Sequence, residues 1–359
     1  MFRAHNFSAG PAGLPTEVLE KAQLELVNYH DVGASIMEVS HRGKEFTSVL
    51  ESAKDRLKRL LGLSENHHIL FLQGGATQQF CTIPMNFLQQ GETADYINTG
   101  VWSKKAIQEA QLFGTINIPF SSESLGFNRV PTENEIVFSK NAKFVHYTSN
   151  NTIYGIHFRN EPETHGIPLV CDASSDFLSR PIDIDKYGLI YAGAQKNLGP
   201  SGAAVVIIHD DFLKKAHTKG IPTFLQYGAH IGDLYNTPPT FTIYLIDLVL
   251  EWLENKGGVS GISEINTAKA TLLYDEIDRD GFYTSSVELN SRSEMNILFR
   301  LPTTELESAF VKQAEANHLI GLKAHRTTGG IRASLYNAVS LDSVKILTTF
   351  MQEFRTKNG

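Results

Sequence analysis

Six short apolar runs, separated by segments of helical periodicity, constrain the fold of this chain more than any other feature. They lie at residues 68–72, 94–98, 144–147, 168–171, 189–192 and 203–208. Each run is continuous rather than alternating, which is typical of strands that are buried on both faces of a sheet. The sequence therefore predicts an α/β fold in which a mainly parallel sheet lies between two layers of helices. Clear helical spacing at 49–61, ended by Gly62, and a helix at 77–88 support this interpretation.

The last hundred residues form a second group of elements. After a helix predicted at 241–254, the segment Asn255-Lys-Gly-Gly258 interrupts the pattern. Beyond it we predict strands at 294–301 and 330–335 and amphipathic helices at 304–317 and 341–355. We therefore expect a large domain over residues 16–257 and a smaller C-terminal α/β domain over residues 258–359. Residues 1–15 are too rich in glycine and proline for an element of their own, and we expect them to pack with the small domain as an extended arm.

Charge and cysteine content argue against several classes of function. A formal net charge of −7 over 359 residues disfavours general nucleic-acid binding, which needs a cationic surface. Cys81 and Cys171 have neither disulfide nor zinc-site spacing, which favours a reducing compartment. The N-terminal segment lacks the apolar core of a signal peptide, and no apolar run reaches the roughly 18 residues of a membrane span. We expect a cytoplasmic enzyme with no metal, membrane or nucleic-acid partner.

One lysine stands out in the segment Ala192-Gly-Ala-Gln-Lys-Asn-Leu-Gly-Pro-Ser-Gly202. Lysines in turns are usually solvated, and position alone leaves that interpretation of Lys196 open. Its neighbours on both sides have almost no side-chain bulk, which suits a lysine that lies beneath a flat ligand. Gln195 and Lys196 also follow an apolar run, and ligands of open α/β sheets bind beyond the carboxyl ends of the strands.

Other strand ends also carry groups that could bind a ligand. Asp172 follows the run 168–171, so its carboxylate either needs a cationic or N–H partner or caps a following helix. Gly74-Gly75-Ala76-Thr77 opens a helix whose free amides favour a phosphate, although a plain turn has the same pattern. Thr152 follows the run 144–147. Trp102 follows the run 94–98 and is either an aromatic platform for a ring or a core residue.

Together these groups match the needs of pyridoxal 5′-phosphate. Its aldehyde requires a lysine amine, its ring nitrogen requires a carboxylate, and its phosphate requires a cup of amides. The chain contains no G-x-G-x-x-G or Walker motif, which argues against a nicotinamide or P-loop nucleotide site. The sequence therefore predicts pyridoxal phosphate as the cofactor.

Histidine–arginine pairs form a second candidate cluster. They are His41-Arg42 and, near the C-terminus, His325-Arg326 followed by Arg332. Arginine binds carboxylate and phosphate through two parallel hydrogen bonds, which lysine cannot match. Any one pair is also compatible with solvated surface charge, but Arg332 alternates with apolar residues in a predicted strand. We infer a site for a small dianion.

The chain as a whole resembles the phosphoserine aminotransferase family, which consists of vitamin B6 enzymes of the aspartate-aminotransferase fold (fold type I). The resemblance runs nearly end to end and includes NFSAGPAGLP, SHRGKEF, LQGGATQQF, NTGVWSKKA, SNNTIYG, CDASSDFLSRPIDIDKYGLIYAGAQKNLGPSG, YNTPPTF and HRTTGGIRASLYNA. It implies a pyridoxal-phosphate-dependent transfer of the amino group of L-glutamate to 3-phosphohydroxypyruvate, which gives O-phospho-L-serine and 2-oxoglutarate in serine biosynthesis. It leaves open whether 4-phosphohydroxythreonine, in vitamin B6 biosynthesis, is also a substrate.

Residue by residue, the resemblance implies a role for each candidate. Lys196 would form the Schiff base with the cofactor, Asp172 would pair with the pyridine nitrogen, and Trp102 would stack on the ring. Further contacts to the cofactor's phosphate or phenolic oxygen would come from Ala76, Thr77, Thr152 and Gln195. The cofactor phosphate of the other subunit of a homodimer would be reached by Asn236 and Thr237. Substrate anions would be held by His41, Arg42, His325, Arg326 and Arg332.

The sequence departs from the family pattern at two places and leaves other functions open. Thr77 stands where some members have an arginine, so anion binding here depends on the remaining cations. Thr148-Ser149 stands where many relatives have a proline, which leaves the loop before Thr152 undefined. The alternatives are another small-substrate aminotransferase of the same branch and a non-catalytic protein that binds the cofactor or a phosphate ligand. A cysteine desulfurase is disfavoured, because neither Cys81 nor Cys171 is placed as a mobile nucleophile.

Overall fold

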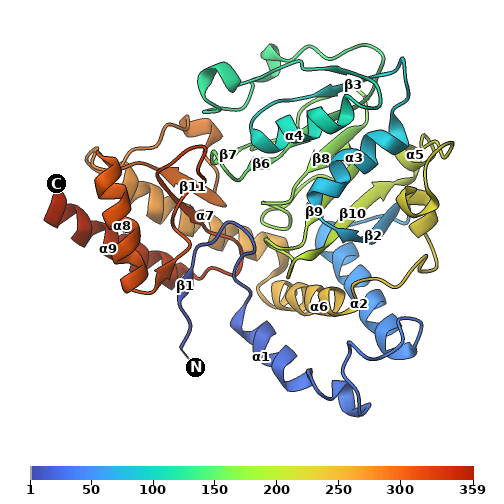
Figure 1. Ribbon diagram of the computed structural model, residues 1–359, viewed down its shortest axis with the longest axis horizontal. Helices are drawn as coiled ribbons and strands as arrows, with labels where there is room; N and C mark the ends of the chain where they lie inside the picture. The colour runs from blue at the N-terminus through green and yellow to red at the C-terminus, as the bar shows by residue number, and fades with distance from the viewer. Residues whose placement is uncertain (1) are drawn as a thin grey trace.

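The computed structural model describes residues 2–359 (Figure 1). Its helices are α1 (Thr16–Glu25), α2 (Lys44–Leu61), α3 (Ala76–Phe87), α4 (Val101–Ala110), α5 (Asp210–Leu213), α6 (Thr240–Asn255), α7 (Gly258–Ile277), α8 (Thr304–Ala316) and α9 (Leu341–Asn358). Its strands are β1 (His5–Asn6), β2 (His67–Gly74), β3 (Thr93–Tyr96), β4 (Thr115–Asn117), β5 (Ala142–Thr148), β6 (Asn150–Asn151), β7 (Ile156–His157), β8 (Leu169–Asp172), β9 (Tyr187–Gly193), β10 (Gly202–His209), β11 (Asn296–Phe299), β12 (Leu319–Ile320) and β13 (Ile331–Ser334). All six predicted apolar runs lie at strands, within one or two residues of the predicted ends.

A seven-stranded sheet forms the centre of the molecule, in the order β2-β10-β9-β8-β5-β3-β4. From β9 to β4 neighbouring strands are parallel, whereas β10 is antiparallel to both β9 and β2. Helices α3 and α4 cover one face of the sheet, and α2 and α6 cover the other (Figure 1). The predicted fold class, a mainly parallel sheet between two helical layers, is confirmed.

Alternate residues of the central strands point toward the two helical layers. In β9, Leu189 and Tyr191 lie in the apolar core on the side of α3 and α4, while Ile190 and Ala192 lie in the core on the side of α2 and α6. Because both faces are buried, most positions of such a strand are apolar, and this produces the continuous runs in the sequence.

From α7 onward, the chain builds a second apolar core. β11 and β13 pair antiparallel, and α7, α8 and α9 bury side chains such as Phe310 and Leu347 against them. The N-terminal segment joins this part, because β1 pairs with β12 and Phe7 lies in the same core. The expectation that residues 1–15 contain no secondary-structure element is therefore wrong, because the short strand β1 lies in this segment. The turn at residues 256–257 separates α6 from α7, yet Ile262 of α7 still packs in the core of the large sheet, so the two cores meet along α7.

Four helices were not predicted from the sequence: α5, which has only four residues, and three longer helices that each have a weak apolar pattern. α1 buries only Val18 and Ala22, and α4 is short and rich in polar residues. α7 places the polar residues Asn266 and Lys269 on its buried side, which disrupts the apolar periodicity that marks an amphipathic helix. Within residues 2–359, no helix is long and apolar enough to cross a membrane.

Candidate active site

Lys196 lies in the turn that joins β9 to β10, at the carboxyl end of the parallel strands. Its amine donates a hydrogen bond to Oγ1 of Thr152 over 2.8 Å and lies 5.9 Å from the centre of the Trp102 ring. Burial lowers the pKa of Lys196 to about 8, the Asp172 carboxylate opposes this shift, and the charge of Arg332 adds to it. Neutral pH therefore leaves part of Lys196 as the neutral, nucleophilic amine.

Asp172 ends β8, the strand between β5 and β9, and its side chain is almost fully buried. One carboxylate oxygen accepts the backbone N–H of Ser174 over 3.0 Å. Residues 174–178 form turns rather than a helix, so Asp172 does not cap a helix. Burial raises the pKa of Asp172, while Ser174 and the charge of Lys196 act in the opposite direction. A cation that binds beside this carboxylate would offset the cost of its burial.

The start of α3 supplies free backbone amides. No side chain of the described residues caps this helix, and Gly75 stands at its N-cap position. A Cβ atom placed on Gly75 would meet nothing within 4 Å, so the space beside this N-cap residue is open. Ala76 and Thr77 form the first turn, with Thr77 exposed. Uncapped amides at a helix N-terminus attract an anion.

Trp102 belongs to α4 and is partly buried. Its ring lies near Lys196, and Nζ of Lys105 lies 4.9 Å from its centre. Its indole N–H is buried without a hydrogen-bond partner in the part of the chain that the structure describes. Trp102 packs at the edge of the core while facing the Lys196 site. It can therefore be both a core residue and an aromatic platform for a ring.

Arg332 brings the C-terminal part of the chain to the same place. It lies on β13, and its Nη1 donates to the carbonyl oxygen of Thr152 over 3.3 Å. Thr152 therefore contacts both Lys196, through its hydroxyl, and Arg332, through its carbonyl. The Nε atom of Arg332 is buried without a partner among residues 2–359, which leaves a donor for an incoming carboxylate or phosphate.

His325 and Arg326 lie in the loop between β12 and β13. Burial lowers the pKa of His325, and the positive charges of Arg332, Arg326 and Lys105 lower it further. The charges of Arg332, Arg326 and Lys105 thus all act on His325 and favour its neutral form. Lys105 was not predicted from the sequence, because a lysine on an unpredicted helix resembles any other surface lysine.

Four predicted residues gather in a separate cluster. Thr237 Oγ1 lies 3.3 Å from Nδ1 of His41, and Asn236 donates to the side chain of Gln73 over 3.0 Å. Arg42 is next to His41 and has an exposed side chain. No hydrogen bond within the described chain joins these residues to Lys196, Asp172 or Arg332. Gln195, by contrast, lies beside Lys196, and its carbonyl accepts the N–H of Ala12 over 2.9 Å.

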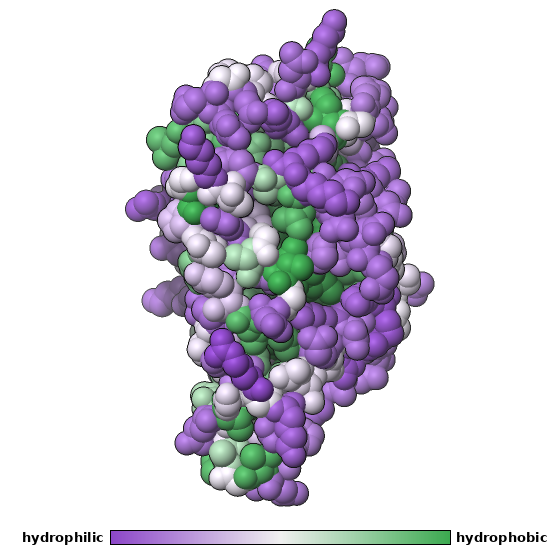
Figure 2. Space-filling model, turned by 90° about the vertical axis from the view of Figure 1, so that its right-hand side faces the viewer, coloured by the Kyte–Doolittle hydropathy of each residue, from purple (hydrophilic) through white to green (hydrophobic). Residues whose placement is uncertain are grey.

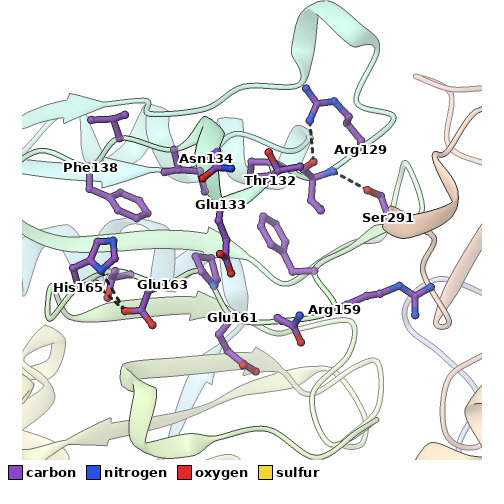
Figure 3. A pocket seen from close by; sticks show the side chains of 18 of the residues that line it. Arg129, Thr132, Glu133, Asn134, Phe138, Arg159, Glu161, Glu163, His165 and Ser291 are labelled. Atoms are coloured by element: carbon purple, nitrogen blue, oxygen red, sulfur yellow. Dashed lines mark hydrogen bonds and ion pairs between the residues drawn. The ribbon is translucent and has the colours of Figure 1, made fainter.

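A cavity of about 940 Å³ lies between the loop 129–140 and the segment 158–167 (Figure 3). Its lining contains none of the residues predicted for the site. Arg129, which Figure 3 shows at its rim, is engaged in an ion pair with Glu135 over 2.7 Å. The groups suited to chemistry therefore lie at the carboxyl ends of the strands rather than in this cavity.

Comparison with known proteins identifies the family of this chain. The family model of class-V aminotransferases matches residues 4–347. The chain belongs to the class-V aminotransferase family. Within that class it is similar to the phosphoserine aminotransferases of Herpetosiphon aurantiacus, at 50% identity, and Niallia circulans, at 49%, with 99% of each chain covered.

Solved structures agree with the sequence relatives. The phosphoserine aminotransferase of Bacillus circulans subsp. alkalophilus superimposes with a TM-score of 0.97 at 49% identity, over 99% of both chains. The pyridoxal-phosphate-bound phosphoserine aminotransferase of Trichomonas vaginalis has a TM-score of 0.92 at 38% identity, over 98% of this chain and 100% of that one. A further phosphoserine aminotransferase structure, in which radiation damage of the Schiff base was followed, has a TM-score of 0.97 at 45% identity.

Proposed function

We propose that this protein transfers the amino group of L-glutamate to 3-phosphohydroxypyruvate, with pyridoxal phosphate as its cofactor, and so forms O-phospho-L-serine for serine biosynthesis. The observation that carries the proposal is the Lys196 amine, which is buried and hydrogen-bonded to Thr152 beside Trp102. The similarity to phosphoserine aminotransferases over 99% of the chain supports it.

The residues around Lys196 fit the chemical groups of this cofactor. Lys196 supplies the amine for its aldehyde, and Asp172 supplies a buried carboxylate for the ring nitrogen. The uncapped start of α3 supplies amides for the phosphate, and the Trp102 ring supplies a surface for the pyridine ring. When bound, pyridoxal phosphate withdraws electrons and so stabilises negative charge on the α-carbon of an amino acid.

Each side chain of the proposed site would have a separate role in the reaction. Lys196 would bind the cofactor and then carry a proton from the α-carbon of the amino donor, as a base whose pKa lies near neutral pH. Asp172 would keep the ring nitrogen protonated, since a buried carboxylate favours an adjacent positive charge. Thr152 would hold the Lys196 amine with its hydroxyl and Arg332 with its carbonyl. One residue would thus fix the distance between proton carrier and substrate anchor.

Substrate selection would rest on the cationic groups. Arg332 would take the carboxylate of either substrate through its guanidinium, whose Nε is free of partners within the described chain. Arg326 and Lys105 would add positive charge for the phosphate of 3-phosphohydroxypyruvate, and His325, whose pKa is lowered, would act as a neutral hydrogen-bonding group. Because Thr77 is neutral, the phosphate group of this substrate would depend on these residues, together with His41 and Arg42.

We propose that the protein acts as a homodimer. We propose that Asn236 and Thr237 of one subunit reach the cofactor phosphate of the other, with His41 and Arg42 beside them. Exposed apolar residues support a contact between copies. Figure 2 shows apolar side chains in a band on one face and on the lobe at its lower end, which Figure 1 shows to be the segment that follows α1. Residues of this kind include Leu24, Val27, Val32, Met37 and Tyr235.

We further propose a domain division at residue 257 and a cytoplasmic location. The separate core built by α7, α8 and α9 supports the division. The two free cysteines, Cys81 and Cys171, support a reducing compartment.

The colour of the protein tests the cofactor assignment. Purified protein should absorb visible light, and reduction with borohydride should fix the cofactor on the peptide that contains Lys196, as measured by mass spectrometry. Lys196→Ala should lose both the fixed cofactor and amino transfer. Lys345→Ala is the matched control, because Lys345 is an exposed lysine of α9 that forms an ion pair with Asp342, away from the proposed site. Cofactor fixed on another lysine, or amino transfer by Lys196→Ala, would contradict the assignment.

A mixing experiment tests the shared site. Lys196→Ala and the double variant Asn236→Ala/Thr237→Ala should each be nearly inactive alone. If subunits exchange at random, half of the dimers are mixed, and each mixed dimer has one intact site. Activity should therefore return to about a quarter of the wild-type value. Mixtures that stay inactive while mixed dimers are detected by native mass spectrometry would contradict the shared site.

A further inference from the structure

Lys269 is a fully buried lysine outside the proposed site. It lies on α7 with no exposed surface, and its amine donates to the carbonyl oxygens of Leu335, Tyr336 and Val339 over 2.9, 2.9 and 3.0 Å. No carboxylate within residues 2–359 pairs with it. Burying an amine costs free energy that an apolar side chain would not. Its three acceptors match the three N–H groups of a protonated amine, so Lys269 fixes the conformation of the segment 335–339.

The segment 335–339 contacts the residue that follows Lys196. The backbone N–H of Asn337 donates to Oδ1 of Asn197 over 3.0 Å. Asn197 is buried, and its own amide group donates to the carbonyl oxygen of Phe177 over 3.1 Å. The turn that carries Lys196 is thus anchored from the C-terminal part of the chain.

The same segment reaches Lys196 by a second route. The hydroxyl of Tyr336 donates to the carbonyl oxygen of Ala9 over 2.7 Å. The next residue, Gly10, lies against the lysine stem: a Cβ atom placed on Gly10 would lie 3.5 Å from Cγ of Lys196. The N-terminal segment therefore packs on Lys196 while it is held by Tyr336.

Helix α7 holds Asn337 from the side as well. Asn266, one turn before Lys269, donates to the side-chain oxygen of Asn337 over 2.9 Å. The side-chain nitrogen of Asn337 donates to the carbonyl oxygen of Leu178 over 2.9 Å. With its backbone N–H also used, Asn337 has little freedom, so a displacement of segment 335–339 passes directly to the Lys196 turn.

We propose that Lys269 is a positioning residue for Lys196. It fixes the segment 335–339, which holds the Lys196 turn through Asn337 and Asn197 and the lysine stem through Tyr336 and the N-terminal segment. The inference rests on the proposed role of Lys196 as proton carrier. A proton carrier is more sensitive to position than a substrate anchor, because proton transfer requires contact at hydrogen-bond distance.

Lys269→Met tests this role, because methionine has a similar length but no donors. The holoenzyme should retain its visible absorbance, while kcat falls roughly 10- to 100-fold, since a displacement of about 1 Å has such an effect. KM for both substrates should stay within about threefold. Amide hydrogen exchange in the holoenzyme should be faster in peptides that cover residues 194–199. A wild-type protein without colour or amino transfer would overturn the proposed function. An active wild type with an equally active Lys269→Met, or with unchanged exchange at 194–199, would overturn this inference alone.

Two further variants separate positioning from loss of stability. Leu347→Ala removes a fully buried side chain from the same C-terminal core without touching the hydrogen-bonded chain. It should lower the melting temperature while kcat and exchange at 194–199 stay near wild type. A loss of kcat in Leu347→Ala as large as in Lys269→Met would overturn the proposal.

Asn197→Ala removes the acceptor of the Asn337 amide and keeps the test available if Lys269→Met does not fold. It should give the same kcat loss with KM preserved, and a wild-type kcat would overturn the proposal.

Discussion

The lowered pKa of Lys196 predicts how fast the protein binds its cofactor at different pH values. Burial lowers this pKa to about 8, with a contribution from Arg332 that Asp172 opposes. Only the neutral amine attacks an aldehyde, so the rate of covalent attachment follows the neutral fraction. At pH 7.5 about a quarter of Lys196 is neutral, compared with about one thousandth of a lysine with an ordinary pKa near 10.5.

Attachment rates above pH 8 distinguish a Lys196 with a lowered pKa from a lysine with an ordinary pKa. With a pKa of about 8, the neutral fraction rises about 50-fold from pH 6 to 8 but only about twofold from pH 8 to 10. An ordinary lysine would still gain about 75-fold over that second interval. The attachment rate should therefore level off above pH 8, because most of Lys196 has already lost its proton.

Stopped-flow absorbance measures this rate after the cofactor has been removed and is added back in excess. The same titration with butylamine in place of the protein, after correction for the neutral fraction of butylamine, gives the pH dependence of the cofactor itself, which is divided out. Arg332→Gln should move the midpoint to higher pH, and Asp172→Asn should move it to lower pH, because these charges act on Lys196 in opposite directions. A rate that keeps rising about tenfold per pH unit up to pH 10 would refute the reasoning.

Three other changes test the site and the fold. Arg332→Ala should lower kcat/KM by roughly 10- to 100-fold, as expected for a lost charged hydrogen bond, while the visible absorbance stays; steady-state kinetics with an unchanged kcat/KM would remove Arg332 from the substrate site. Gly321→Ala should destabilise the protein by about 1–3 kcal/mol in urea unfolding, because Gly321 has φ of 80° and a Cβ there would lie 2.6 Å from the backbone nitrogen of Ser8. Leu347→Ala should cost about 2–5 kcal/mol by the same measurement, since this side chain is fully buried; a cost below about 1 kcal/mol would show that the core collapses around the gap.

Local sequence patterns were sufficient to predict most of the strands and helices of the fold. The continuous apolar runs predicted six strands of the central sheet, because burial on both faces removes polar residues from a strand. The same reasoning missed α7, where Asn266 and Lys269 occupy buried positions. A helix whose inner face makes polar contacts has no apolar stripe, so periodicity cannot find it.

The candidate site was predictable only in part, for the same reason. Small residues around Lys196 and the strand-end position of Asp172 are visible in the sequence. The link from Lys196 through Thr152 to Arg332 spans three distant segments and is absent from any local pattern. Lys105 became a candidate only when its position over Trp102 was known.

The sequence by itself determined most of the strands and helices, the α/β class, and the residue types that pyridoxal phosphate needs, because periodicity and chemical identity are properties of short segments. Only the tertiary structure decided the order of the strands, the antiparallel direction of β10 and the degree of burial of each charge. The pKa of Lys196 and the anchoring of Asn197 by Lys269 depend on contacts between residues far apart in the chain. The contacts of Arg332 and Asn337 join the C-terminal part of the chain to the Lys196 turn, and no local sequence pattern records them.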